Sequence, residues 1–378
     1  MMIQHPAYLQ TDDAFCDGVM TSLQCDGKTP RSVSLRRISL PRDTGIWSLA
    51  RTWRASMSFP PGEGMVHRVG AAGRMQALSR QLQDGPVDFL CIWRGLLGRS
   101  LMGTYLARSL GVPCAFFERG PLPGWLQIDP NGVNARNSVP RDAAFFRRWR
   151  ATFEGPQADW RDLRATLQAR TPRRALSRQD RREDWSGEGP FLFVPFQLNV
   201  ANDPLPDAGW AADAGDLVEV LARASLSLPK GWHLRLKPHP NARGDLARLV
   251  DRHPNARMVI DRTTNSLDQL KASRGVITVN SAMGIEAFFF DKPVIVLGDS
   301  YYGGLGRTEL APSPEALALL LADPDALQFD ATARDDLMTF LFNDYFVRDE
   351  DLRAGHFTAQ DLLARHARHE ALAAREEQ

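Results

Sequence analysis

The chain has 378 residues, of which 43% are hydrophobic and 24% are charged. This length is sufficient for two domains of ordinary size, and the composition excludes a disordered or fibrous protein. With 46 lysines and arginines against 45 acidic residues, the net charge of +1 provides no overall field that attracts nucleic acid, so we expect no nucleic-acid partner.

The cysteines and the N-terminal segment predict a location. The four cysteines show no CxxC spacing, and we interpret them as reduced thiols of a cytoplasmic protein. The first residues, MMIQHPAYLQ, lack the basic and apolar segments of a signal peptide. No apolar run approaches the roughly 20 residues that span a bilayer. We therefore expect a cytoplasmic protein that contacts a membrane only peripherally.

The N-terminal part of the chain is only partly readable. Residues 87–93 (VDFLCIW) predict a buried strand, residues 98–111 a helix, and residues 112–118 (VPCAFFE) a second strand. Strand, helix and strand within about thirty residues indicate a βαβ unit and a parallel sheet. Residues 32–40 also suggest a strand, and the remainder of residues 1–80 shows no pattern that we can assign.

Residues 147–185 are rich in arginine and include RRWR and RTPRRALSRQDRRED. One interpretation is a solvated helix and linker between two domains. The other is a basic patch for an anionic acceptor or for lipid headgroups.

Strands and helices alternate strictly after residue 190. Strands are predicted at residues 191–196, 232–236, 256–261, 275–280 and 292–298, and helices at 215–229, 244–253, 266–273, 281–290 and 313–323. This alternation predicts a doubly wound sheet. In such sheets ligands bind beyond the carboxyl ends of the strands.

The segment KPHP, Lys237 to Pro240, lies at one of these strand ends. Each proline fixes its own φ and lacks an N–H, and Pro240 disfavours a helical backbone at His239. The result is a stiff elbow that presents Lys237 and His239 where a ligand is expected. The alternative is a structural histidine without a functional role.

A second segment, VNSAMGIEAFFFDKPVIVLGDSYYGGLG at residues 279–306, runs from a strand through Asn280 and Ser281 into a helix. A helix N-terminus offers free N–H groups and a positive dipole end. Small residues such as Ser281 and Gly284 would let a phosphate approach the backbone, and Glu286 could then reach a ribose hydroxyl. The alternative is that Ser281 only caps the helix and Glu286 lies on the surface.

Together these segments resemble the bacterial capsule-synthesis glycosyltransferases of the KpsC/KpsS type, which transfer the acidic sugar Kdo from CMP-Kdo. Two further stretches are similar to that family: FFERGPLPGWLQIDPNGVN at residues 116–134 and FVPFQLNVANDP at residues 193–204. The resemblance spans roughly residues 87–310.

The resemblance implies an α/β protein of the GT-B kind, with two Rossmann-like domains that face each other across a cleft. We expect residues 1–185 to form the acceptor-side domain, including the arginine-rich linker. Residues 186–345 would form the nucleotide-sugar domain, and residues 346–378 a C-terminal helix that packs back on the first domain.

The resemblance also implies roles for carboxylates and amides. A retaining transfer requires a carboxylate nucleophile and a second group that handles the acceptor proton. The family pattern assigns the nucleophile to Asp203, with Asp207 as a fallback because the spacing from Gln197 to Asp203 is longer than usual. Gln197 would position the donor, and Glu118 is the candidate acid/base group.

The same resemblance suggests how the donor is bound. Lys237 and His239 would meet the CMP phosphate or the sugar carboxylate, Asn280 and Ser281 the phosphate, and Glu286 the ribose. Cationic and dipolar groups of this kind stabilise a nucleotide leaving group. No Asp-x-Asp motif stands at the end of any strand that the sequence predicts, so we expect neither a metal nor another cofactor.

The expected partners are a nucleotide-sugar donor and a glycan or glycolipid acceptor on the cytoplasmic side of the membrane, with peripheral contact to the inner membrane or to a polysaccharide assembly complex. Three alternatives remain open. The first is a GT-B enzyme that uses CMP-sialic acid or a UDP-sugar, the second a sugar epimerase, and the third a non-catalytic subunit of an assembly complex.

Overall fold

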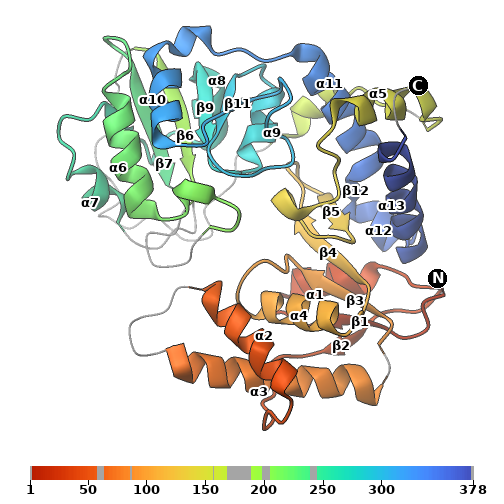
Figure 1. Ribbon diagram of the computed structural model, residues 1–378. Coiled ribbons are helices and arrows are strands. Elements are labelled where there is room, and N and C mark those ends of the chain that lie inside the picture. The colour runs from red at the N-terminus through yellow and green to blue at the C-terminus, as the bar shows by residue number, and fades with distance from the viewer. Residues whose placement is uncertain are drawn as a thin grey trace. The chain divides into compact units, whose positions relative to one another are not determined.

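The computed structural model describes residues 2–57, 64–85, 87–155, 157–167, 189–197, 205–238 and 245–375. These residues form two compact units (Figure 1). Unit 1 comprises Met1–Gly120, Gly124–Phe153 and Leu341–Gln378, and unit 2 comprises Pro121–Pro123 and Glu154–Phe340. Each unit is built on one sheet covered by helices, which confirms the predicted α/β class with two Rossmann-like domains.

Unit 1 has a six-stranded sheet in the order β12-β5-β4-β3-β1-β2. Its strands are β1 (Pro6–Leu9), β2 (Arg31–Val33), β3 (Phe89–Trp93), β4 (Cys114–Arg119), β5 (Trp125–Asp129) and β12 (Val347–Arg348). Strands β1 to β4 pair in parallel, whereas β5 and β12 are antiparallel to their neighbours. The helices are α1 (Ala14–Ser22), α2 (Thr44–Ala55), α3 (Gly64–Asp84), α4 (Gly98–Ser109), α5 (Ala143–Thr152), α12 (Asp349–Arg353) and α13 (Ala359–Ala373).

Both faces of the unit 1 sheet are buried. Successive side chains of a strand point to opposite faces. In β3, Leu90 and Ile92 therefore join a core with residues of α2, α3 and α4, whereas Phe89 and Cys91 join a second core with residues of α1, α12 and α13. This two-sided burial explains why the strand reads as a continuous apolar run.

Unit 2 has six parallel strands in the order β11-β10-β9-β6-β7-β8. They are β6 (Phe191–Phe196), β7 (His233–Pro238), β8 (Met258–Ile260), β9 (Gly275–Thr278), β10 (Val294–Val296) and β11 (Glu309–Leu310). The helices are α6 (Ala214–Ser225), α7 (Leu246–Val250), α8 (Ser266–Ala272), α9 (Met283–Phe288), α10 (Pro314–Ala322) and α11 (Ala331–Phe340). Read from β8, the strands follow the Rossmann order 3-2-1-4-5-6.

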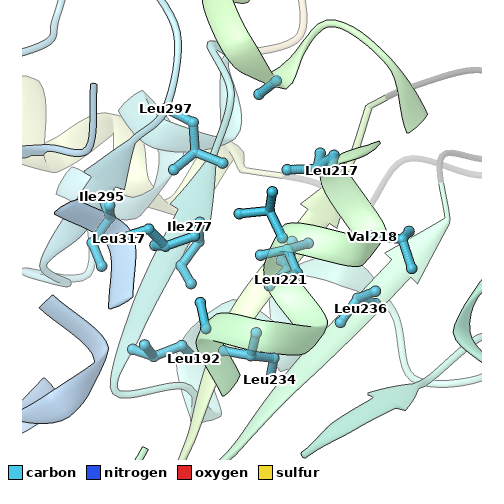
Figure 2. Packing of buried hydrophobic residues seen from close by; sticks show 14 of the residues in the cluster. Leu192, Leu217, Val218, Leu221, Leu234, Leu236, Ile277, Ile295, Leu297 and Leu317 are labelled. Carbon is cyan, nitrogen blue, oxygen red and sulfur yellow. The ribbon is translucent and has the colours of Figure 1, made fainter. Parts of the chain in front are cut away.

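The core of unit 2 lies between this sheet and α6 and α10. Leu192 of β6, Leu234 of β7 and Ile277 of β9 present their side chains to Leu221 of α6 and Leu317 of α10 (Figure 2). All five are essentially inaccessible to solvent. Because each buried leucine or isoleucine contributes about 1.5–3 kcal/mol, this cluster fixes the sheet that carries the loops described below.

Two sequence-based expectations need correction. The strand expected at residues 32–40 ends at Val33, and the chain beyond it runs along α3, where the backbone N–H of Ser39 donates to the carbonyl of Gly73 at 3.0 Å. The C-terminal segment is not a single helix, because β12 and α12 precede α13. The strands and helices expected from residue 191 to residue 323 are all present.

The unit boundaries fall elsewhere than the domain boundaries that we expected near residues 185 and 345. The structure changes unit between Phe153 and Glu154 and again between Phe340 and Leu341. Helix α13 belongs to unit 1, where Arg365 donates to the carbonyls of Ile128 at 2.6 Å and Tyr345 at 2.7 Å. Much of the arginine-rich stretch, residues 168–188, lies outside the described residues.

All four cysteines are buried and none forms a disulfide. Burial raises the pKa of Cys16 to about 11 and those of Cys25 and Cys114 to about 12, which keeps these thiols protonated at neutral pH. Within the described residues, no helix combines the length and the apolar character needed to cross a bilayer.

His233, the first residue of β7, makes unit 2 sensitive to acid. Its ring stacks on Phe191 with a centroid distance of 5.5 Å, and only 5% of the residue is exposed. Burial, and secondarily the charge of Arg235, lowers the pKa of His233 to about 4. Below the ordinary pKa of about 6.5, the unfolded chain therefore binds a proton that the folded chain does not.

The free energy of unfolding of unit 2 should consequently fall as the pH drops from 6.5 toward 4. His233→Gln should remove this pH-dependent loss of stability. We expect the wild-type protein to lose about 2 kcal/mol more than His233→Gln between pH 7 and pH 5. Urea unfolding at the two pH values measures the difference, with His253→Gln as a matched control that retains the wild-type response. Equal losses for wild type and His233→Gln would rule out this origin of the acid sensitivity.

Candidate functional site

The candidate site of unit 2 lies where the winding of its sheet reverses, between β6 and β9. In an open parallel sheet, the crevice beyond the carboxyl ends of the strands at this switch point is where ligands bind. Gln197 directly follows β6, and Asn280 is the second residue after β9. Two of the predicted site residues therefore lie at the switch point itself.

Gln197 and Asn280 are joined by hydrogen bonds. The Oε1 atom of Gln197 accepts hydrogen bonds from the hydroxyl of Thr278 at 3.2 Å and from the backbone N–H of Asn280 at 3.1 Å. Its Nε2 atom donates to Oδ1 of Asn280 at 3.3 Å. Three hydrogen bonds from one side chain fix the turn after β9 relative to the end of β6.

Ser281 continues this turn into α9. Its N–H donates to the hydroxyl oxygen of Thr278 at 3.1 Å, and its carbonyl accepts a 2.6 Å hydrogen bond from the hydroxyl of Tyr302. Its own hydroxyl accepts from the N–H of Met283, the first residue of α9, at 3.2 Å, although the N-cap position itself is Ala282. The expected phosphate contact of Ser281 stays a prediction beside this role.

Gly284 and Glu286 are both buried in α9, which rules out the alternative that Glu286 lies on the surface. A Cβ added to Gly284 would lie 2.5–2.6 Å from the Tyr302 ring and hydroxyl, so this ring packs against the Cβ side of the glycine. The expected approach of a phosphate to Gly284 stays a prediction. Glu286 is not on the surface, because only 6% of the residue is exposed. Its contact with a ribose stays a prediction.

The loop before α6 approaches the same strand ends. The Nδ2 atom of Asn280 donates to the carbonyl of Pro206 at 3.0 Å, and the N–H of Asp299 donates to the carbonyl of Asp207 at 2.7 Å. Asp207 adopts φ of +56° and lies at the edge that carries Asn280. Asp203, the preferred nucleophile, lies outside the described residues, so its role stays a prediction.

Lys237 supports the neighbouring strand end. Its ammonium donates to the carbonyls of Thr264 at 2.7 Å and Arg262 at 3.3 Å, which ties β7 to the segment after β8. Burial lowers the pKa of Lys237, and the charge of Asp261 opposes this shift. With two carbonyls bound, Lys237 retains one N–H for a ligand. His239 lies outside the described residues.

In unit 1, Glu118, the last residue but one of β4, forms an ion pair. Its Oε2 atom accepts from Nε of Arg94 at 2.5 Å, and its Oε1 atom accepts from the N–H of Arg119 at 2.8 Å. Arg94 follows β3 with φ of +61°, and the charge of Glu118 is the main cause that raises the pKa of Arg94. The expected acid/base role of Glu118 stays a prediction, and it now includes Arg94 as a partner.

Sequence reasoning missed Thr278, Tyr302 and Arg94. Thr278 is the last residue of a buried strand, and a polar residue in that position could have indicated a hydrogen bond to the next strand end. Tyr302 and Arg94 gave no such signal, because their contacts join segments far apart in the chain. Among the described residues, no cluster of three histidine, cysteine or acidic side chains could hold a metal ion.

Comparison with known proteins identifies sequence relatives. The family described as "Capsule polysaccharide biosynthesis protein" matches residues 164–344. Protein FixF of Sinorhizobium fredii is 30% identical over 327 residues, which cover 85% of this chain and 73% of that protein. The Capsule polysaccharide export protein KpsS of Escherichia coli is 25% identical over 257 residues, which cover 53% of this chain and 64% of that protein.

Solved structures show a more distant likeness. KpsC of Thermosulfurimonas dismutans, a beta Kdo 2,7 transferase, aligns with a TM-score of 0.47 at 14% identity and covers 93% of this chain and 98% of its own. The MnaA–UDP structure of S. aureus aligns with a TM-score of 0.37 at 11% identity, covering 89% of this chain and 91% of its own.

Proposed function

Because the chain belongs to the capsule polysaccharide biosynthesis family, we propose that it is a glycosyltransferase that takes its sugar from a nucleotide donor. The observation that carries this proposal is the Gln197–Asn280 network at the switch point of unit 2. It joins two strand ends of a Rossmann sheet at the edge where nucleotides bind. The hydrogen bonds of Gln197 hold the turn after β9 in one conformation, which suits a binding site that is formed before its ligand arrives.

We further propose that the donor is CMP-Kdo and that the anomeric configuration is retained. In the first step, a carboxylate of Asp203 attacks the anomeric carbon as CMP departs with the bonding electrons. In the second step, an acceptor hydroxyl displaces the carboxylate and gives its proton to a base, for which Glu118 is the candidate. Lys237 and His239 would stabilise the charge on the departing phosphate. The acceptor would be a glycan or glycolipid at the cytoplasmic face of the membrane.

Thermal unfolding with CMP, UDP, GDP or ADP tests the donor site. A ligand that binds only the folded protein raises its unfolding temperature by mass action. We expect a shift with CMP that is lost in His239→Ala and kept in His253→Ala, a matched histidine that follows α7. A larger shift with UDP than with CMP would mean that the donor is a UDP-sugar and not CMP-Kdo. No shift with any nucleotide would contradict a donor site.

Consumption of the donor separates an enzyme from a binding subunit of an assembly complex. We expect wild-type protein to release CMP from CMP-Kdo in the presence of acceptor. We expect Asp203→Asn to bind CMP but not to release CMP from CMP-Kdo. If wild-type protein binds CMP but never consumes CMP-Kdo with any capsular glycan tested, the non-catalytic alternative is favoured. If Asp203→Asn keeps full turnover, Asp207→Asn becomes the next variant to measure.

A further inference from the structure

The charge of the chain is unevenly distributed, and unit 1 holds a basic region. Residues 31–80 contain nine arginines but only two acidic residues, Asp43 and Glu63. The whole chain, in contrast, has a net charge of +1. A local excess of this size attracts anionic partners, although the protein as a whole is nearly neutral.

Large apolar side chains are exposed in the same region. They come from the segment after β2 and from the first turns of α3, and their exposed fractions are 62% for Ile38, 71% for Leu40, 59% for Met65, 73% for Val66 and 46% for Val69. Single exposed apolar side chains are ordinary, but five in two neighbouring segments need an explanation. We refer to these five residues as the 38–69 surface.

The two segments lie side by side. Ser39 donates its N–H to the carbonyl of Gly73, and a Cβ on Gly73 would lie 2.6 Å from Cγ2 of Ile38. Residues three and four apart share one face of a helix, so Val69 lies one turn from Gly73 on the face that Ile38 contacts. Met65 and Val66 lie one further turn along that face, about 6 Å away at 1.5 Å per residue. Ile38, Val69, Val66 and Met65 therefore follow one face of α3, and Leu40 lies two residues beyond Ile38, between the contacts of Ser39 with Gly73 and of Arg42 with Gln76.

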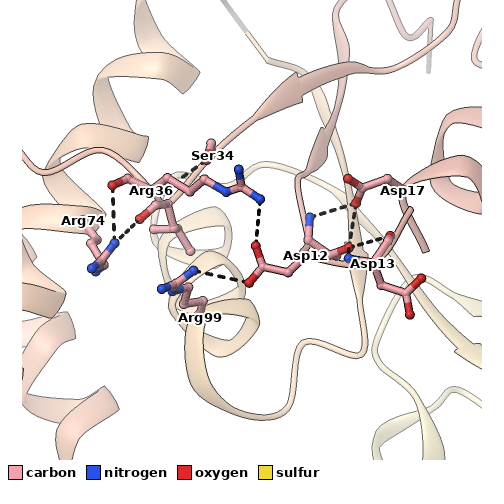
Figure 3. Close-up of polar contacts among 9 residues, drawn as sticks. Asp12, Asp13, Asp17, Ser34, Arg36, Arg74 and Arg99 are labelled. Carbon is pink, nitrogen blue, oxygen red and sulfur yellow. Dashed lines mark hydrogen bonds and ion pairs between the residues drawn. The ribbon is translucent and has the colours of Figure 1, made fainter. Parts of the chain in front are cut away.

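Arginines border this surface. Arg37 precedes Ile38 and Arg42 follows Leu40, both are exposed, and neither forms an ion pair with any described residue. Arg36 is also exposed, although Asp12 pairs with it at 2.8 Å. Arg74 of α3 donates to the carbonyl of Leu35, which holds the basic segment against the helix (Figure 3).

We propose that the 38–69 surface docks unit 1 on a membrane that contains anionic phospholipids. Exposed leucine, valine and methionine side chains gain free energy when they enter the acyl boundary of a bilayer, and arginines beside them meet the phosphates of the headgroups. A second copy of the chain is a poorer occupant, because a two-fold contact would bring the arginines of both copies together. This inference does not depend on the donor site of unit 2.

This surface is not the segment in which the sequence suggested lipid contact, residues 147–185. The described arginines of residues 147–167 include Arg148, which pairs with Asp142 at 3.2 Å, and Arg161, which pairs with Asp335 at 2.7 Å. Side chains held by carboxylates of their own unit have less charge to offer to lipid phosphates. The 38–69 surface, which combines exposed apolar side chains with neighbouring arginines, therefore suits a membrane better than residues 147–167 do.

Sedimentation of the full chain with vesicles tests the proposal. We expect wild-type protein to bind vesicles of equal parts phosphatidylcholine and phosphatidylglycerol, and to bind pure phosphatidylcholine much more weakly. Arg37→Gln/Arg42→Gln should weaken partitioning into the anionic vesicles about 30-fold at low salt, and less at high salt because salt screens the charges. Leu40→Ser/Val66→Ser should weaken it at least about tenfold at both salt concentrations.

Matched controls come from unit 2. Leu226→Ser/Leu319→Ser removes exposed apolar side chains, and Arg248→Gln/Arg252→Gln removes exposed charges, so both should bind vesicles as wild type does. Unfolding temperatures confirm that each variant is folded. Equal binding of wild type to neutral and anionic vesicles, or equal losses in the controls, would overturn the proposal. A wild-type dimer that Leu40→Ser/Val66→Ser dissociates would instead identify a second copy as the occupant, and would also overturn it.

Discussion

The Asp344→Ala variant should lose about 3–5 kcal/mol of the unfolding free energy of unit 1, the cost of removing one partner from a buried charged network. Asp344 lies in the π-helical turn Leu341–Tyr345 that follows α11, and 7% of its side chain is exposed. Its Oδ2 atom accepts from the indole N–H of Trp149 at 2.7 Å and lies 2.9 Å from Nε2 of His369. One carboxylate thus joins α5, this turn and α13.

The charge of Asp344 is itself stabilised by the fold. Burial alone would raise the pKa of its carboxyl, but the hydrogen bonds and charges of His369 and Arg368 outweigh burial and lower the pKa to about 2. The carboxylate is therefore ionised at neutral pH. Its removal would break the 2.7 Å hydrogen bond from the indole N–H of Trp149, a residue only 1% exposed, and a buried polar group that loses a partner is costly.

Urea unfolding and hydrogen exchange together measure this loss. The exchange of peptides from α5 and α13 should accelerate in Asp344→Ala, while peptides from β6 and β9 of unit 2 should be unaffected. The control is Asp351→Ala, which removes an exposed carboxylate that lies 3.6 Å from His356 and should change stability by less than about 1 kcal/mol. If Asp344→Ala costs no more than this control, apolar packing rather than the polar network holds α13 on unit 1.

The sequence predicted unit 2 better than unit 1 for a physical reason. In the described residues from β6 to α10, the apolar side chains of the central strands are buried, so each short apolar run marks a buried strand, and the alternating periodic segments mark helices. In residues 1–80, helices α1, α2 and α3 were missed. Exposed apolar side chains such as Phe15 of α1 and Val66 of α3 obscure the periodicity on which such predictions depend.

The candidate site was likewise predictable only in part. The alternation of strands and helices placed Gln197 and Asn280 at strand ends, and both lie at the switch point. The role of Gly284 could not be predicted. It depends on the loop after β10, which folds back so that Tyr302 packs on α9, and no local pattern encodes a contact between residues 18 positions apart.

Gly284→Ala should destabilise unit 2 by about 1–3 kcal/mol, the typical cost of overpacking a core. Replacing a helical glycine by alanine normally gains about 0.5–1 kcal/mol, so the sign depends on the contact with Tyr302. The added Cβ would lie 2.5 Å from Cε2 and 2.6 Å from Cζ of a ring that is fully buried and bonded to the carbonyl of Ser281. The ring cannot move without disturbing that carbonyl, so the variant should also lose stabilisation by CMP.

A double-mutant cycle isolates this contact. Tyr302→Leu alone should destabilise unit 2, because it removes a buried ring and the hydrogen bond to Ser281. In Gly284→Ala/Tyr302→Leu the clash is absent, so the double variant should be at least about 1 kcal/mol more stable than the sum of the single changes implies. Gly18→Ala is the control, because Gly18 lies in α1 and a Cβ there would meet nothing within 4 Å. Additive effects in the cycle would mean that Gly284 is required for another reason, and the phosphate approach first expected for it would return as the explanation.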